Sequence, residues 1–178
     1  MMHSRLTSYL PTLCILLLGL SQSACAQDQQ VLIDQARAAA PAMVSKDATI
    51  MYRGKILVEG SNGWTCMPEA LPDDMAAMCN DATWMEMMGA VGNKAPYTAT
   101  KVGVSYMLQG DGGVSNSDPY HPDPKSAKDF IKEGPHLMLI LPKEMLTGIT
   151  DDPHKGGPYV MWKDTPYAHI MIPLSDRE

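Results

Sequence analysis

Short apolar runs bounded by glycine and proline recur through the last third of the chain, residues 134–173. Three times a proline is followed by an aromatic or imidazole ring and then by an apolar run that contains methionine: Pro135–Met138, Pro158–Met161 and Pro166–Met171. Runs of this length between glycine and proline indicate buried strands rather than helices. We therefore predict that the domain closes with strands from these segments.

The rest of the chain adds helical patterns and further strand patterns. They are predicted at residues 29–40 (helix), 48–68 (small antiparallel unit with turns at Arg53-Gly54 and Gly60–Gly63), 72–92 (two short helices) and 101–109 (strand). The order shows no regular β-α-β alternation. This predicts an α+β fold, a mainly antiparallel sheet of about six strands with two to four short helices.

The beginning of the chain has the pattern of a secretory leader. One basic residue, Arg5, precedes an apolar run at residues 10–20 and an A-x-A sequence that ends at Ala26. This predicts a signal peptide over residues 1–26, cleaved after Ala26, and a periplasmic or secreted protein. The alternative is a lipoprotein with a lipid anchor at Cys25. The apolar run is about half of the ~20 residues that span a bilayer, and the sequence predicts no transmembrane segment.

Behind the leader the chain has room for one domain. We predict an N-terminal helix and linker at residues 27–47 and a single globular α+β domain at residues 48–178. Loss of the leader removes one basic residue and no acidic one, which changes the formal net charge from −6 to −7. Without a basic cluster, this charge argues against nucleic acid as a partner, because phosphate contacts supply most of that affinity.

Two cysteines remain in the predicted domain, Cys66 and Cys79. An even pair in an oxidising compartment predicts a disulfide. The alternatives are a metal site or a redox pair, but a spacing of thirteen residues without C-x-x-C fits neither pattern well.

Two predicted strands each carry one histidine, His136 and His169. Alternate residues of a strand share a face, so both imidazoles converge on one face if these strands pair. With a third ligand such as His154, they form a candidate zinc or copper site. The alternative is that each ring is a core side chain bonded to a backbone carbonyl. No local metal-ligand motif of the H-E-x-x-H type is present.

These histidines lead to two functional hypotheses. The first is a binding or interaction module for a small ligand or a metal, centred on His136 and His169 with Tyr159 and Tyr167 as further ligand-binding residues. The loops at residues 110–126 and 151–157 then form the rim of the site. The second is a secreted hydrolase, with or without a bound metal, that uses the same histidines. No catalytic motif is present, so the catalytic residues are unknown, as are the partners.

Methionine is the outlier of the composition, with 15 residues against one phenylalanine. Patterns such as M-x-M and M-x-x-M suit the soft ion Cu(I). Methionine also fills hydrophobic cores, and its spread over several predicted strands favours that interpretation.

Four segments together carry a resemblance: W-T-C-M-P at Trp64–Pro68, S-Y-M-L-Q-G-D at Ser105–Asp111, G-P-H-L-M at Gly134–Met138 and G-G-P-Y-V-M-W at Gly156–Trp162. The chain resembles an uncharacterised family of small exported bacterial (hypothetical) proteins with no assigned activity. The resemblance spans roughly residues 48–173 and implies one intact domain. It implies no functional residue.

Overall fold

A computed structural model describes residues 15–71, 74 and 76–176, with the side chains of residues 15–26 excepted. The chain divides into two compact units, Met1–Val31 and Leu32–Glu178. Most of the predicted signal peptide, including the side chain of Cys25, lies outside the described part. Its cleavage and the alternative lipid anchor therefore stay predictions.

Three α-helices and three short 3₁₀ helices occur among the described residues. They are α1 (Ile15–Ala38), α2 (Ala42–Ser45), α3 (Ala82–Gly92), η1 (Pro124–Ser126), η2 (Lys143–Leu146) and η3 (Pro153–Lys155). Within this described part, no helix has the length and apolar character needed to cross a membrane.

The strands of the second unit form one large sheet and one small sheet. The large sheet contains β1 (Thr49–Tyr52), β2 (Lys55–Val58), β3 (Thr65–Met67), β4 (Met78–Asn80), β5 (Gly103–Met107), β8 (His136–Ile140), β9 (Tyr159–Met161) and β10 (His169–Pro173). The small sheet contains β6 (Val114–Ser115) and β7 (Phe130–Ile131). The large sheet has the order β2-β1-β3-β4-β5-β8-β10-β9, and all its pairs are antiparallel except β1 with β3.

This architecture confirms the predicted α+β class and the mainly antiparallel sheet. The large sheet has eight strands rather than about six. The difference comes from short strands such as β4, whose three residues are too few to display a two-residue alternation.

Residues 48–68 do not form the purely antiparallel unit that their pattern predicts. Arg53 and Gly54 join β1 to β2 with φ angles of 48° and 77°, as a tight turn of the predicted hairpin requires. After β2, however, the chain crosses back, and β3 pairs with β1 in parallel. The crossing passes close to β1 at Gly60, where a Cβ atom would collide with the backbone of Thr49.

Only one of the two helices predicted within residues 72–92 forms among the described residues. Asp73, the predicted start of the first helix, lies outside them, and Met78–Asn80 is strand β4 instead. The carboxylate of Asp74 closes a turn here, because it accepts hydrogen bonds from the backbone N–H groups of Ala70, Leu71 and Ala76. These bonds offer the segment an alternative to helical pairing.

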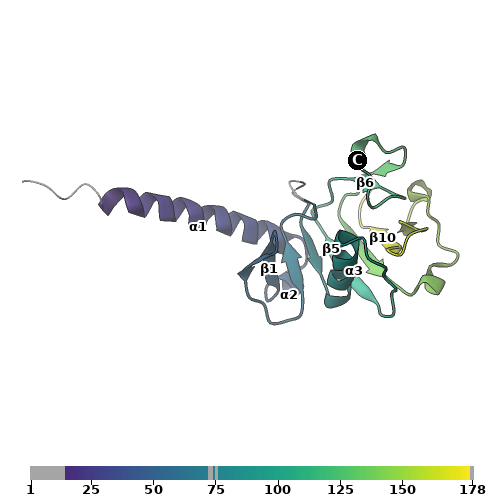
Figure 1. Ribbon diagram of the computed structural model, residues 1–178, viewed down its shortest axis with the longest axis horizontal. Coiled ribbons are helices and arrows are strands. Elements are labelled where there is room, and N and C mark those ends of the chain that lie inside the picture. The colour runs from purple at the N-terminus through teal and green to yellow at the C-terminus, as the bar shows by residue number, and fades with distance from the viewer. Residues whose placement is uncertain (1–14, 72–73, 75, 177–178) are drawn as a thin grey trace, which may run out of the picture. The chain divides into compact units, whose positions relative to one another are not determined.

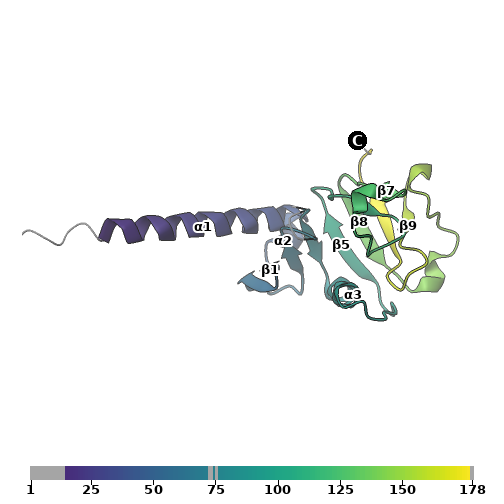
Figure 2. The ribbon, with the colours of Figure 1, turned by 45° about the horizontal axis from the view of Figure 1, so that its top comes forward.

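Helix α3 begins at the predicted cap, Asp81. One carboxylate oxygen of Asp81 accepts from the backbone N–H of Trp84 at 2.8 Å, and the other accepts from Val104 of β5 at 2.8 Å. A single side chain therefore caps the helix and fixes its start against the sheet. Figures 1 and 2 show α3 beside β5.

The apolar side chains of the second unit form clusters on the two faces of the large sheet. On β5, Met107 belongs to the cluster that includes Trp84 and Met87 of α3. Its neighbour Tyr106 contacts a cluster on the opposite face, which contains the end of α1 and the disulfide. A third cluster covers that opposite face around Ile170 of β10.

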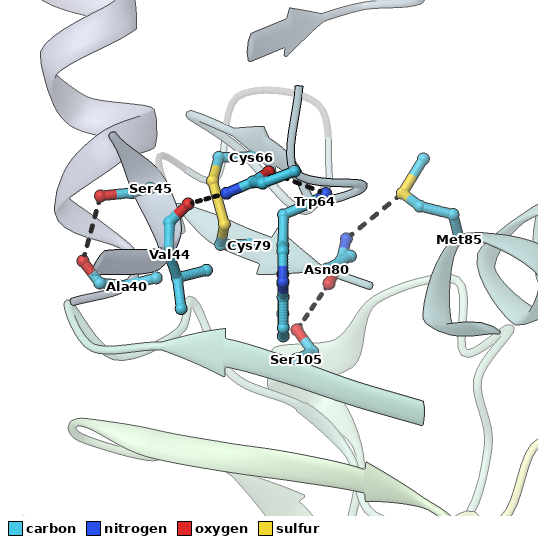
Figure 3. The surroundings of a disulfide bond; sticks show 10 residues. Ala40, Val44, Ser45, Trp64, Cys66, Cys79, Asn80, Met85 and Ser105 are labelled. Atoms are coloured by element: carbon cyan, nitrogen blue, oxygen red, sulfur yellow. Dashed lines mark hydrogen bonds between the residues drawn. A yellow bond between two sulfur atoms is a disulfide. The ribbon is translucent and has the colours of Figure 1, made fainter. Parts of the chain in front are cut away.

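The predicted disulfide between Cys66 and Cys79 is confirmed. The two residues lie directly opposite each other on β3 and β4, and both are fully buried. Figure 3 shows the disulfide near Trp64 and near Asn80, the next residue of β4. The buried amide of Asn80 accepts from the hydroxyl of Ser105 at 2.6 Å and donates to the sulfur of Met85, so its polar atoms are satisfied.

Replacement of both cysteines, Cys66→Ala with Cys79→Ala, is expected to lower the free energy of unfolding by about 3 kcal/mol. The loop closed by the bond has a sequence separation of 13, and opening it restores conformational entropy to the unfolded chain. Urea denaturation of the oxidised protein and of the double variant measures this difference. Equal midpoints for the two proteins would contradict a stabilising role.

Candidate functional site

A cavity of about 520 Å³ lies within the second unit, on the face of the sheet that packs against α3. Its volume is in the range of small-ligand sites, roughly 300–1,000 Å³. Exposed side chains at its rim are Leu71, Asp123 and Lys125, so the cavity reaches the surface there. Seven of its lining residues are methionines: Met78, Met87, Met88, Met107, Met138, Met161 and Met171.

Strand register places several of these methionines around His169. In the pairing of β10 with β9, His169 lies directly opposite Met161. Met171 follows on the same face of β10, opposite Met138 of β8. All four residues line the cavity and are buried. The C-terminal strands therefore surround one imidazole with thioether side chains.

The imidazole of His169 has one occupied nitrogen and one unpartnered nitrogen. Nδ1 lies 2.9 Å from the backbone carbonyl oxygen of Tyr167. Because a carbonyl only accepts hydrogen bonds, Nδ1 carries the proton and donates it. Nε2 then presents a lone pair, and it is buried without a hydrogen-bond partner. Trp84 and Trp162 contact the ring at near-perpendicular angles, with centroids 5.2 Å and 5.0 Å away, which holds its orientation.

Burial lowers the pKa of His169 to about 4. The hydrogen bond to the Tyr167 carbonyl opposes this shift, and the electrostatic interaction with His136 adds to it. His169 is therefore neutral at pH 7, and Nε2 keeps its lone pair.

His136 lies on the same face of the sheet as His169, but the two are not cross-strand neighbours. His136 is opposite Pro173, four residues further along β10 than His169, or roughly 13 Å of strand. Its Nδ1 is 2.7 Å from the carbonyl oxygen of Gly134, and its Nε2 is also buried without a partner. Unlike His169, it is not one of the residues that line the cavity.

A buried polar group lies near His136. Glu133 is 1 % exposed, and one of its carboxylate oxygens accepts from the hydroxyl of Tyr159 at 2.8 Å. Asp111, which does line the cavity, accepts from the backbone N–H groups of Glu133 and Gly113. Burial raises the pKa of Asp111, although these backbone bonds and the electrostatic interaction with His136 lower this pKa in part. The hydroxyl of Tyr159 is thus engaged inside the core and does not line the cavity.

Tyr167 contacts the loop that borders the cavity. Its hydroxyl donates to the carbonyl of Ala95 at 2.7 Å and lies 2.9 Å from the hydroxyl of Tyr120. Tyr120 belongs to the loop at residues 110–126, from which several residues line the cavity. The predicted rim loop therefore does border the cavity, whereas no residue of the other predicted rim loop, 151–157, lines it.

His154 lies in η3 and is exposed. The described residues contain no group of three or more His, Cys, Asp or Glu side chains that could hold a metal ion. The structure therefore does not bring His136, His169 and His154 together as the ligand set predicted for zinc or copper.

Two tryptophans of the site were not among the predicted site residues. Trp162 lies directly after Met161 of β9, and its indole N–H donates to the carbonyl of Ser115 at 3.0 Å. Trp84 lies in the first turn of α3, and its indole N–H is buried without a partner. The M-x-M and M-W patterns around them are the features of the sequence that point to this site.

The scan against protein-family models, the search of curated proteins and the search of solved structures found no match to the chain.

His169 is expected to make the folded protein less stable as the pH falls from 6.5 to 4. In this interval the unfolded chain binds a proton on His169 that the folded chain does not bind, because the folded pKa is lowered. The free energy of unfolding should therefore decrease by about 3 kcal/mol as the pH falls from 6.5 to 4. Denaturant unfolding at several pH values, compared with His169→Asn, measures it. An identical pH slope in the variant would contradict the assignment.

Tyr159→Phe is expected to lower the free energy of unfolding by about 1–3 kcal/mol, because Glu133 loses a hydrogen-bond donor in the core. Tyr106→Phe is the matched control, since it removes a hydroxyl from the opposite face and should change stability by less than about 0.5 kcal/mol. Thermal and urea denaturation compare the two variants. Equal effects would show that the bond to Glu133 contributes nothing.

Proposed function

We propose that this protein is an exported binding module whose ligand occupies the methionine-lined cavity and is held by Nε2 of His169. The predicted leader and the disulfide support export, because disulfides persist in oxidising compartments. The apolar wall supplies most of the contact area, and one polar atom orients the ligand, which is the usual composition of a small-ligand site.

The observation that carries this proposal is the unpartnered Nε2 of His169, a residue that lines the cavity. Buried nitrogen acceptors in folded proteins are nearly always hydrogen-bonded, and one without a partner carries a desolvation penalty. A ligand that offers a hydrogen-bond donor or a metal ion to this lone pair removes that penalty. His169 therefore supports ligand binding more directly than His136, whose ring does not line the cavity.

The chemistry of the wall favours binding over hydrolysis. Among the described residues that line the cavity there is no Ser, Thr or Cys nucleophile. The Nδ1 atom of His169 bonds a backbone carbonyl rather than a carboxylate, and the ring has its pKa lowered to about 4. A base of this strength is poorly matched to catalysis near neutral pH.

The compound 2-naphthol is a suitable probe, because its flat apolar rings fit a cavity of this size and its hydroxyl donates one hydrogen bond. We expect it to bind the full chain and His169→Asn to weaken the binding about 10-fold, the loss of about one hydrogen bond. Asn retains a donor for the Tyr167 carbonyl but does not reach the position of Nε2. Isothermal titration calorimetry measures both affinities.

The matched ligand 2-methoxynaphthalene has the same rings without a donor. It should bind the wild-type chain and His169→Asn equally. If 2-naphthol binds neither protein, or if the variant weakens both ligands to the same extent, Nε2 does not anchor a donor ligand in this cavity.

A further inference from the structure

The atoms available to a ligand in the cavity are mostly soft. Seven methionines line it together with His169, whose Nε2 has no hydrogen-bond partner. The oxygen ligands are less available: Asp74 accepts three backbone N–H bonds, and one oxygen of Asp111 accepts two. Asp123 is exposed at the rim. A metal ion in the interior therefore meets sulfur and imidazole rather than carboxylate.

Such a ligand set selects a soft monovalent ion. Thioether sulfur favours Cu(I), whereas Zn²⁺ takes thiolate, imidazole and carboxylate groups. Cys66 and Cys79, the only cysteines whose side chains the structure describes, are joined in a disulfide and offer no thiolate. In addition, the thioether and imidazole groups are neutral, and burial of an uncompensated charge in an apolar site is far more costly for a divalent ion than for a monovalent one.

We infer that the cavity binds Cu(I) through Nε2 of His169 and the sulfur atoms of Met161 and Met171. This inference rests on the proposed function and names the class of ligand. Met161 is the cross-strand partner of His169, and Met171 follows two residues later on the same face. The three side chains are at most 3 % exposed, so the ion is removed from water once it is bound.

The surroundings of these three residues support the assignment. Methionine has three rotatable side-chain bonds, so its sulfur can move toward an ion without a change of backbone. Met138 and Met87 line the same wall and offer further sulfurs. The rings of Trp84 and Trp162 flank His169, and indole is the aromatic group that attracts cations most strongly. Nε2 carries no proton, so binding requires no deprotonation.

The test is an anaerobic competition for Cu(I) between the full chain and the chelator bathocuproine disulfonate, with ascorbate as reductant. Cys14 and Cys25 are replaced by serine in every protein, because free thiols also bind Cu(I). We expect one Cu(I) per chain. His169→Asn should weaken binding more than about 100-fold, since loss of a group that only orients a ligand already costs roughly 10–100-fold. Met161→Leu with Met171→Leu should weaken it to a similar extent.

Met51→Leu with Met67→Leu is the matched control, because these methionines lie on β1 and β3 and do not line the cavity. It should leave the Cu(I) affinity unchanged. X-ray absorption at the copper edge should show nitrogen and sulfur atoms bound to copper in the protein whose cavity residues are unchanged. Circular dichroism confirms that each variant is folded; should His169→Asn be unfolded, the methionine pair alone decides the outcome.

The inference is overturned if Cu(I) does not bind, or if the cavity variants and the control bind it equally. Its failure is separable from failure of the proposed function. If 2-naphthol binds through His169 while Cu(I) does not bind, the cavity is a small-molecule site and only the metal assignment is wrong. If neither probe depends on His169, both proposals are wrong.

Discussion

The pairing register of β8, β10 and β9 determines which side chains of the C-terminal strands face α3 and line the cavity. Because Met138 lies opposite Met171 and Met161 lies opposite His169, all four side chains are on the face that α3 covers. A shift of one residue along β10 would turn His169 and Met171 to the opposite face. The cavity, its sulfur lining and the unpartnered nitrogen all depend on this one alignment.

Local patterns in the sequence predicted those parts of the fold that short-range interactions decide. The Arg53-Gly54 turn, the Asp81 cap and the disulfide each depend on a few residues of characteristic chemistry. Strand β4 and the parallel pairing of β1 with β3 were not predictable in this way. The first is three residues long, and the second depends on which distant strand completes the sheet.

The candidate site shows the same division between local and long-range information. Two-residue alternation predicted that His136 and His169 share a face, and the structure places both rings there. Alternation says nothing about how far apart two residues lie along paired strands, and here four residues of β10 separate their positions. The methionines were predicted as core side chains. They are buried in the core, and they also line a cavity within it, which composition alone does not distinguish.

The sulfur lining also has a consequence for the lifetime of the protein in an oxidising environment. Oxidation converts a methionine thioether into a sulfoxide, a bulkier and strongly polar group. Met88 is partly exposed, whereas Met161 and Met171 are almost completely buried. Oxidants would therefore attack the wall from its accessible side inward. Each sulfoxide formed would narrow the cavity and add an oxygen acceptor. Oxidation would therefore change the shape and polarity of the binding site before it destabilised the fold.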